Sequence, residues 1–356
     1  MRLSLIKSMV AACLTSLAVP ALAAGTLTVV VGGGLLGEGQ IKALVEPFEK
    51  ETGNKVVIVK DQISLAQLKL AETSKSQTVD VMSVSGANGI AATRAGYLAD
   101  IDYSIYDKND LGAIDPRARK PWGIEHFYFA SVLGVDTRKL ASPAARPNDW
   151  RDVWDTKRFP GVRTLQSGQY GDEGPWEEAL LADGVPVDKL YPLDIERVFR
   201  SLDRIKPSVR RWWTVGSEAM QLFDGQVAMG MIPDGRALSL QAAGKPVQMN
   251  YDGAKVNGLF WVIPKSAPHA RLAQQFVEFA MRPKQQAEVA RLTNYAPTNQ
   301  RAFQFIDKTL ATKLISFPAN MKHAYIVDAE WYAAVGADGK TNAQRLVERW
   351  NQWILK

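Results

Sequence analysis

The residues best suited to bind a small ligand gather in one stretch of the chain, residues 210–236. Its two ends hold charged and aromatic side chains, namely Arg210, Arg211, Trp212, Trp213, Asp234 and Arg236. An arginine can hold a carboxylate through two parallel hydrogen bonds, an aspartate can pair with an amine, and tryptophan offers a flat surface that attracts a cation. Because charged side chains are rarely buried unpaired beside tryptophan, the cluster favours a pocket for a small ligand that carries both charges. For any single residue, the alternative is that the tryptophans belong to the core and the arginines are solvated.

One helix and one strand should connect the two ends of this stretch. Apolar residues recur at helical spacing in its middle, at Ala219, Met220, Leu222 and Phe223. Gly225 ends the predicted helix, and residues 227–232 have the pattern of a short buried strand. Cation, aromatic surface and carboxylate are therefore predicted to lie at the ends of a single structural unit.

The first 23 residues are typical of a secretory signal peptide. Arg2 and Lys7 make its start positive, residues 9–19 form a short apolar run, and Ala-Leu-Ala at 21–23 fits a cleavage site. We predict export and cleavage after Ala23. The run is too short to remain as a membrane span.

Removal of this segment changes the chemistry available to the chain. Cys13 is its only cysteine, so the mature chain would have no disulfide, thiol nucleophile or thiolate metal ligand. Loss of Arg2 and Lys7 lowers the formal net charge from +6 by two, to +4. No run of five basic residues follows, which argues against a nucleic-acid partner. The length suggests two domains.

The first third of the mature chain alternates strands and helices. Strands are predicted at residues 26–31, 55–59 and 79–84, helices from Gln40 to Phe48 and over 65–72, and a loop over 32–39. Continuous apolar strands in this order indicate an α/β fold with an open parallel sheet. Ligands of such sheets bind beyond the carboxyl ends of the strands, here at residues 32–39 and 83–88.

The remainder of the chain is less regular, but it shows no internal repeat. Helices are predicted to start at Asn148-Asp149-Trp150 and to cover residues 177–181, 195–202, 218–223, 270–280 and 342–355. Strands are predicted at 127–135, 162–165, 227–232 and 258–263.

The glycine-rich segment after the first predicted strand resembles a nucleotide-binding motif. Gly32, Gly34 and Gly37, followed by Asp61 after the next strand, match the dinucleotide-binding fingerprint almost in full. Export argues against a nucleotide cofactor, and the glycines also suit a tight turn whose free N–H groups could bind an anion. We therefore predict no cofactor.

No metal or hydrolytic site is predicted. The three histidines, His126, His269 and His323, lack the spacing of a zinc site, and the absence of an adjacent Tyr-Tyr pair weakens a ferric-iron site. No G-x-S-x-G or P-loop occurs. Glu177 and Glu178 are interpreted as solvated charges at an exposed helix start.

Aromatic residues outside the stretch divide into two groups. Tyr295 lies in a predicted loop and could equally be a surface residue or a ligand contact, and the same holds for Trp122, Tyr128 and Trp176. Four others have the positions of packing residues on helix faces: Trp150, Trp154, Trp350 and Trp353.

Taken in order, many short motifs resemble those of the periplasmic solute-binding proteins of ABC importers, in the spermidine/putrescine-binding group. They include the glycine-rich loop after the first strand, PFEKETG at 47–53, VDV at 79–81, ALLADGV at 179–185, LYPLD at 190–194, VAMG at 227–230, DGR at 234–236, IPK at 263–265 and YAPTN at 295–299. The resemblance covers nearly the whole mature chain.

This resemblance implies a two-lobe α/β periplasmic binding protein of type II, in which each lobe has a mostly parallel sheet flanked by helices. Lobe 1 would comprise residues 24–130 and 259–300, and lobe 2 residues 131–258 and 301–356, with crossovers near 129–135 and 256–261. The lobes would close on the ligand about a hinge, and a membrane permease would recognise the closed form. The resemblance also implies a periplasmic monomer without enzymatic activity.

Departures from the polyamine-binding pattern bear on the ligand. The strand at 256–262 carries no acidic residue, and the first loop has glycine where this group often has tryptophan. The remaining pattern is similar to members that bind γ-aminobutyrate, because an arginine contacts a carboxylate and a polyamine has none.

We therefore expect a receptor for a small, γ-aminobutyrate-like amino-carboxylate. Arg211 would hold the carboxylate and Asp234 the amine, and Trp213 and Tyr295 would form the walls. The other lobe would supply backbone or hydroxyl donors, from Gly33, Gly34, Ser85 and Gly86.

Three points stay open in this expectation. Neighbouring strand residues face opposite ways, so only one of Arg210 and Arg211, and one of Trp212 and Trp213, should face the cleft. Arg236 could be a second carboxylate ligand or the partner of Asp234. A polyamine receptor, and less favourably an exported nucleotide-binding enzyme, are the alternatives.

Overall fold

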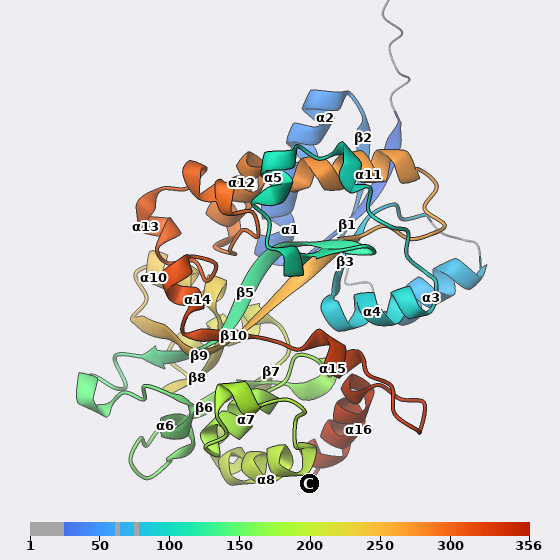
Figure 1. The fold of residues 1–356 in the computed structure, drawn as a ribbon. Helices are drawn as coiled ribbons and strands as arrows, with labels where there is room; N and C mark the ends of the chain where they lie inside the picture. Colours follow the sequence, from blue (N-terminus) through green and yellow to red (C-terminus); the bar gives the residue numbers. More distant parts are fainter. Residues whose placement is uncertain (1–24, 61–64, 75–77) are drawn as a thin grey trace, which may run out of the picture.

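Two long antiparallel strands, β5 (Gly123–Asp136) and β9 (Val247–Val262), run through the middle of the molecule and connect its two lobes (Figure 1). The structure is a computed structural model that describes residues 25–60, 65–74 and 78–356. The predicted signal peptide and Asp61 lie outside these residues. The lobe boundaries proposed above stay a prediction, although β5 and β9 do pass through residues 130 and 258.

The other elements follow the chain in an α/β order. The remaining strands are β1 (Thr26–Val31), β2 (Lys55–Lys60), β3 (Met82–Ser85), β4 (Arg119–Lys120), β6 (Arg163–Gln166), β7 (Val209–Trp213), β8 (Met229–Pro233) and β10 (Ala324–Ile326). The helices of the first half are α1 (Gly34–Gln40), α2 (Glu46–Thr52), α3 (Leu65–Ser74), α4 (Gly86–Arg94), α5 (Lys108–Gly112), α6 (Trp150–Trp154), α7 (Trp176–Ala182) and α8 (Ile195–Ile205). Those of the second half are α9 (Gly216–Phe223), α10 (Asp234–Ala242), α11 (Ala270–Ala280), α12 (Pro283–Thr293), α13 (Lys308–Ala311), α14 (Pro318–Met321), α15 (Ala329–Ala333) and α16 (Asn342–Ile354).

The strands of each lobe pair in parallel, and the crossing strands run against them. β1 and β2 are parallel in one lobe, and β6 is parallel to both β7 and β8 in the other. β3 and β8 pair antiparallel with β9 and β5. β10 lies parallel to β9 and forms a third segment beside the crossing strands. The sheet of β1 and β2 is therefore parallel, whereas the sheet that contains β5 and β9 is mixed, because these two crossing strands are antiparallel to each other.

The glycine-rich segment after β1 is a helix, which corrects the predicted loop at residues 32–39. α1 begins at Gly34 with Gly33 as its N-cap, and continues through a π-helical turn at Ile41–Val45 into α2. A Cβ on Gly37 would lie 1.8 Å from the carbonyl oxygen of Gly32. The glycine at 37 is thus required for the helix to pack against the end of β1, which explains the motif without a phosphate ligand.

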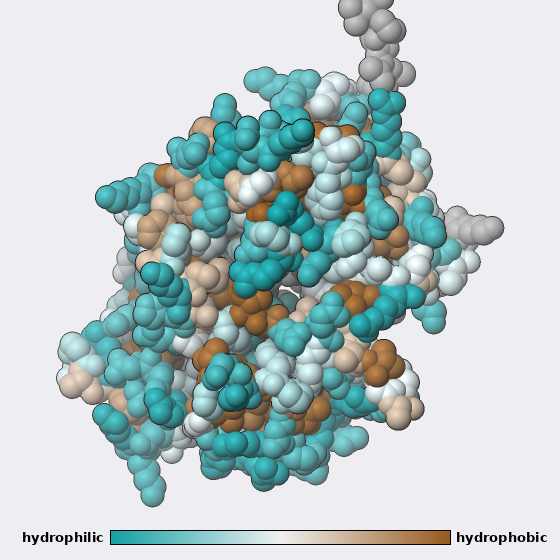
Figure 2. All heavy atoms as spheres, in the orientation of Figure 1, coloured by the Kyte–Doolittle hydropathy of each residue, from teal (hydrophilic) through white to brown (hydrophobic). Residues whose placement is uncertain are grey.

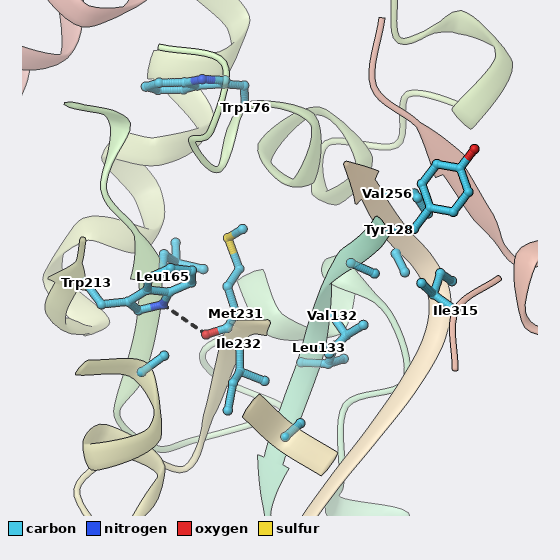
Figure 3. Packing of buried hydrophobic residues seen from close by; sticks show 14 of the residues in the cluster. Tyr128, Val132, Leu133, Leu165, Trp176, Trp213, Met231, Ile232, Val256 and Ile315 are labelled. Atoms are coloured by element: carbon cyan, nitrogen blue, oxygen red, sulfur yellow. Dashed lines mark hydrogen bonds between the residues drawn. The ribbon is translucent and has the colours of Figure 1, made fainter. Parts of the chain in front are cut away.

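Tryptophans fill the core of the lower lobe in Figure 1. Trp176 and Trp213 are buried, and the Trp213 Nε1 donates a 3.0 Å hydrogen bond to the carbonyl of Met231 (Figure 3). In the C-terminal helix α16, Trp350 and Trp353 pack against each other. The prediction that Trp150, Trp154, Trp350 and Trp353 are packing residues is confirmed.

Glu177 and Glu178 are fully buried, so the interpretation of these residues as solvated charges was wrong. Lys255 of β9, also fully buried, places its Nζ 2.9 Å from Glu177 Oε2 and 3.0 Å from Glu178 Oε2. Burial alone would lower the pKa of Lys255, but the two carboxylates outweigh it and raise the pKa above its ordinary value. The tyrosine hydroxyls of Tyr191 and Tyr332 donate to Glu177 Oε1. A lysine distant in sequence provided the partner that the local sequence could not reveal.

Replacing Lys255 with methionine should lower the free energy of unfolding by about 3–5 kcal/mol, because two buried carboxylates would lose their counterion. Lys245→Met is the matched control: Lys245 forms a largely exposed ion pair with Asp224 and should cost less than about 1 kcal/mol. Urea unfolding followed by tryptophan fluorescence measures both. Equal effects of the two variants would contradict a stabilising role for the buried cation.

Candidate ligand-binding site

A cavity of about 230 Å³ lies between the lobes, against the crossing strands. Figure 2 shows a hollow in the surface between the upper and lower halves of the molecule, with apolar atoms at its edges. The lining comes from the start of α4, from β5 and β9, from the loop before α7, and from the segment that follows β10. Its charged members, amides and hydroxyls are Ser85, Arg117, Lys120, Glu125, Tyr128, Asp172, Glu173, Asn257, Asp328, Glu330 and Tyr332. Segments from both lobes and all three crossing segments therefore meet at this cavity.

Two neighbouring carboxylates, Asp172 and Glu173, form one wall. Ser85, at the N-cap of α4, donates a 2.6 Å hydrogen bond to Asp172 Oδ2 and so connects the two lobes. Gln166 Nε2 donates to Glu173 Oε2 over 3.1 Å. Burial raises the pKa of Glu173 to about 7, with the charge of Asp172 adding to the effect, and burial also raises the pKa of Asp172. Among the ion pairs of the described residues, neither carboxylate has a cationic partner. Both are therefore available to a cation from outside the protein.

Arg236 is a cation that lies close to the same seam, and no ion pair of the described residues includes it. It follows Asp234 and Gly235 at the start of α10, and its guanidinium carbon is 5.9 Å from the centre of the Tyr295 ring. Its Nε is buried and has no hydrogen-bond partner in the described part of the chain. Burial raises the pKa of Tyr295, while Arg236 opposes this rise and the charges of Asp234 and Glu173 add to it. The Tyr295 ring is thus near both the unpaired cation and the acidic wall.

The walls near Tyr295 are aromatic. The Tyr295 ring stacks on Phe127 with centroids 5.2 Å apart and lies 6.1 Å from Phe129, which lines the cavity. A Cβ on Gly235 would lie 2.7 Å from the Tyr295 ring, so only glycine allows this close contact between α10 and the Tyr295 loop. Apolar rings here can enclose the methylene chain of a ligand.

Asp234 is fully buried, and its Oδ1 accepts hydrogen bonds from the backbone N–H groups of Ala130 and Gly235 at 3.0 and 2.8 Å. The Tyr251 hydroxyl is 3.4 Å from Oδ2, but it is closer to the Lys313 carbonyl oxygen, at 2.7 Å. Burial raises the pKa of Asp234 to about 7, although these hydrogen bonds oppose the rise. None of these bonds involves Arg236. Asp234 therefore fastens α10 to the crossing strand β5.

The residues at the start of the 210–236 stretch lie away from the cavity lining. Arg210 and Arg211 on β7 are both exposed, and Arg211 is 3.4 Å from Glu218. Trp212 packs against Trp350 and Trp353 of α16, at centroid distances of 5.1 and 5.4 Å. As noted above, Trp213 is buried in the core beside Met231. Asp234, Arg236 and Tyr295 lie together in the structure, beside the cavity and not among its described lining residues. Arg210, Arg211, Trp212 and Trp213 make the other contacts given above and are also outside that lining.

The four donors expected from the other lobe also divide into two pairs. Ser85 and Gly86 line the cavity at the start of α4. Gly33 and Gly34 are exposed at the start of α1, outside the cavity's described lining.

Sequence reasoning missed the acidic wall, although a signal for it existed. Asp172 and Glu173 lie in a glycine-rich loop soon after β6, beyond its carboxyl end, where ligands of α/β sheets bind. The same position relative to a strand predicts the sites after β1 and β3, and for β6 it predicts this loop.

The far end of the cavity contains a further carboxyl group. Gly258 on β9 leaves room for Glu125, because a Cβ at this position would lie 2.2 Å from Glu125 Oε1. Burial raises the pKa of Glu125 to about 8, although a hydrogen bond with Tyr128 opposes the rise. Burial thus favours the protonated form of Glu125, which can donate a hydrogen bond.

The described residues contain neither a candidate metal site nor a candidate membrane-spanning helix. No group of three or more histidine, cysteine, aspartate or glutamate side chains there could hold a metal ion. No helix among them has the length and apolar character needed to cross a membrane.

Comparison with known proteins shows the family of this chain. The bacterial extracellular solute-binding protein family matches residues 43–348. The chain belongs to this family. Solute-binding proteins are non-enzymatic components of transport systems, and they deliver small molecules to a membrane permease.

Individual relatives of this solute-binding protein agree over most of its length. The γ-aminobutyric acid-binding protein of Pseudomonas aeruginosa is 29% identical over 337 residues, which cover 93% of this chain and 91% of that protein. The spermidine/putrescine-binding periplasmic protein of Escherichia coli is 24% identical over 305 residues, covering 83% and 84%. The structure of an ABC transporter substrate-binding protein from Bradyrhizobium japonicum matches with a TM-score of 0.83 and 29% identity, covering 93% of this chain and 99% of that one. The protein is therefore the substrate-binding component of an ABC transporter, with the two-lobe type II fold.

The raised pKa of Glu173 predicts how the ligand-free protein responds to pH. The folded state holds the proton of this carboxyl more tightly than the unfolded state, in which the pKa is near its ordinary value of 4.5. Its stabilising contribution is therefore complete below about pH 4.5 and is lost as the pH rises through about 7. Glu173→Gln, which cannot ionise, should gain stability relative to the wild type as the pH rises from 5 to 8.

Denaturant unfolding at pH 5, 6, 7 and 8 measures this difference. Glu46→Gln, the same change at an exposed position of α2, is the matched control. A difference between Glu173→Gln and wild type that does not change with pH would show that Glu173 ionises normally in the folded protein.

Proposed function

We propose that this solute-binding protein captures a small amino-carboxylate of the γ-aminobutyrate type between its lobes. The observation that carries the proposal is that Arg236 and Glu173, neither of which forms an ion pair among the described residues, both act on the Tyr295 ring. Arg236, with its buried Nε, lies near Tyr295, and the charge of Glu173 acts on the same tyrosine. A ligand with one carboxylate and one ammonium group would provide a counterion for Arg236 and another for Glu173.

The free energy of burying charges explains why such a ligand suits this site. A buried charge without a partner is costly, and charge-assisted hydrogen bonds to a ligand remove that cost. In the proposed complex, Arg236 holds the carboxylate, and Glu173 and Asp172 hold the ammonium group. Tyr295 and Phe129 enclose the methylene chain between them.

This assignment differs from the sequence-based expectation in two roles: carboxylate binding passes from Arg211 to Arg236, and amine binding from Asp234 to Asp172 and Glu173. Arg211 is exposed and close to Glu218, whereas Arg236 lies near Tyr295 and forms no ion pair among the described residues. Asp234 is fully buried outside the cavity lining, and its Oδ1 accepts two backbone hydrogen bonds, whereas Asp172 and Glu173 line the cavity. Ser85 and Gly86 keep their proposed place at the opposite wall. Gly33, Gly34, Arg210, Trp212 and Trp213 have no part in the proposed contacts.

The transport cycle would follow from this site. The lobes would close about β5, β9 and the segment at β10, and the permease would recognise the closed, monomeric protein. The γ-aminobutyric acid-binding relative supports the choice of ligand. A polyamine is the second candidate, and the acidic members of the cavity lining, Asp172, Glu173, Asp328 and Glu330, favour it.

Calorimetric titration with γ-aminobutyrate tests the carboxylate contact. Arg236→Ala should weaken binding by about 10- to 100-fold, the value of one or two charge-assisted hydrogen bonds. Arg211→Ala, which removes an exposed arginine near the same stretch, should change the dissociation constant by less than about threefold. The reverse order of effects would return the carboxylate to Arg211.

The amine contact is tested with the same titration and a second ligand. Glu173→Gln should weaken γ-aminobutyrate by about tenfold and leave butanoate, which lacks the ammonium group, nearly unchanged. Binding of putrescine, together with no binding of γ-aminobutyrate, would establish the polyamine receptor instead.

Export to the periplasm is part of the proposal. We expect a mature protein that begins at Ala24, because the Ala-Leu-Ala sequence at 21–23 fits signal-peptidase cleavage. The intact mass of the protein recovered from the periplasmic fraction checks this expectation, and a mass that includes Cys13 would contradict it.

A further inference from the structure

The buried lysine of β9 contacts the loop that carries the acidic wall. Besides its two carboxylate partners, Lys255 Nζ donates a short hydrogen bond to the carbonyl oxygen of Gly174. Gly174 directly follows Asp172 and Glu173 in sequence, and Glu177 and Glu178 lie in the first turn of α7, the helix after it. One ammonium group therefore holds both the loop and the helix start to the crossing strand.

The same strand also contributes to the cavity. Asn257 and Gly258, two and three residues after Lys255, line it. Lys255 pairs with Ser131 of β5 in the antiparallel ladder, and with Tyr325 of β10 in the parallel one. Tyr332 of α15, which also lines the cavity, donates to Glu177 Oε1 over 2.6 Å. Lys255 thus lies where the three crossing segments, the acidic loop and α15 come together.

We propose that Lys255 is a positioning residue. It holds the loop with the Asp172 and Glu173 carboxylates against the crossing strands, so that these carboxylates can select a ligand with an ammonium group. The inference rests on the proposed function for the identity of the ligand, but the positioning itself does not depend on it. Without the bond to Gly174, the acidic loop would keep its bonds from Ser85, Gln166 and Trp176 but lose the hydrogen bond that ties its backbone to β9. The carboxylates could then shift relative to the crossing strands. Arg236, at the other end of the site, would keep its place, because α10 is held separately by Asp234 and β5.

A neutral replacement of the whole buried cluster separates positioning from stability. Lys255→Met alone leaves two uncompensated carboxylates, so the test uses the triple variant Lys255→Met/Glu177→Gln/Glu178→Gln, in which no buried charge is left unpaired. The hydroxyl donors of Tyr191 and Tyr332 can still bond to the amide at position 177. Lys245→Met is the control for loss of a lysine elsewhere on the same lobe.

Hydrogen exchange of the ligand-free protein is the first measurement. In the wild type, the Asp172 amide, which donates to the Tyr170 carbonyl over 2.9 Å, should be protected. In the triple variant its exchange should be about tenfold faster, while the core strands β5 and β8 remain unchanged. An unprotected Asp172 amide in the wild type, or equal protection in the triple variant, would overturn the proposal. This result does not depend on which ligand the protein binds.

Ligand discrimination is the second measurement. The ratio of affinities for γ-aminobutyrate and butanoate should fall about tenfold in the triple variant, because only the ammonium contact is lost. Equal weakening of both ligands would show a merely structural role and would overturn the positioning role. A wild-type protein that binds neither ligand would instead refute the proposed function, and the exchange measurement would still decide the positioning of the loop.

Discussion

The buried ion pairs of Lys255 with Glu177 and Glu178 constrain the structure more than any other interaction described here. All three side chains are fully buried, and they join a crossing strand to the helix that follows the acidic loop. Replacement of such a cluster by apolar residues is often neutral for stability, so stability alone gives little reason to keep it. What it does provide is a specific geometry, because an ammonium group between two carboxylates and a carbonyl admits few arrangements. Because Lys255 also bonds to the carbonyl of Gly174, the cluster fixes the position of the adjacent acidic wall of the cavity.

The seam between the lobes shows the opposite arrangement of charge. This seam contains three charged side chains, Arg236, Asp172 and Glu173, which form no ion pairs among the described residues. Burial raises the pKa of Glu173. In the first region the protein supplies a counterion to each charge, although the buried Glu178 Oε1 has no hydrogen-bond partner among the described residues. In the second region, no ion pair among the described residues supplies one. Charges that a fold neutralises internally serve its architecture, whereas charges that it leaves unsatisfied identify the place where something else must bind.

Much of the fold followed from hydrophobic patterning, but the site followed only in part. The strands β1 and β2, the helix α11 and the C-terminal helix α16 were predictable, because each shows a clear apolar period over its own residues. The choice between Arg211 and Arg236 was not, because it depends on Glu218 and Tyr295, whose positions are set by tertiary packing. The burial of Glu177 and Glu178 escaped prediction for the same reason, since their partner is about 80 residues away in sequence. Local sequence reveals which charges exist; only the fold shows which of them remain without partners.

The unpaired charges also bear on how closure would be coupled to the ligand. A ligand shifts a two-state equilibrium only by the difference between its affinities for the two states. With the lobes closed and the site empty, Arg236 and the acidic wall are desolvated without counterions, which raises the free energy of that state. An amino-carboxylate supplies a counterion to each end and removes both penalties at once. A polyamine would neutralise the carboxylates but would add positive charge near Arg236, so it would relieve one penalty and increase the other. The arrangement of these three side chains therefore favours closure on a ligand of mixed charge over closure on a cation of similar length.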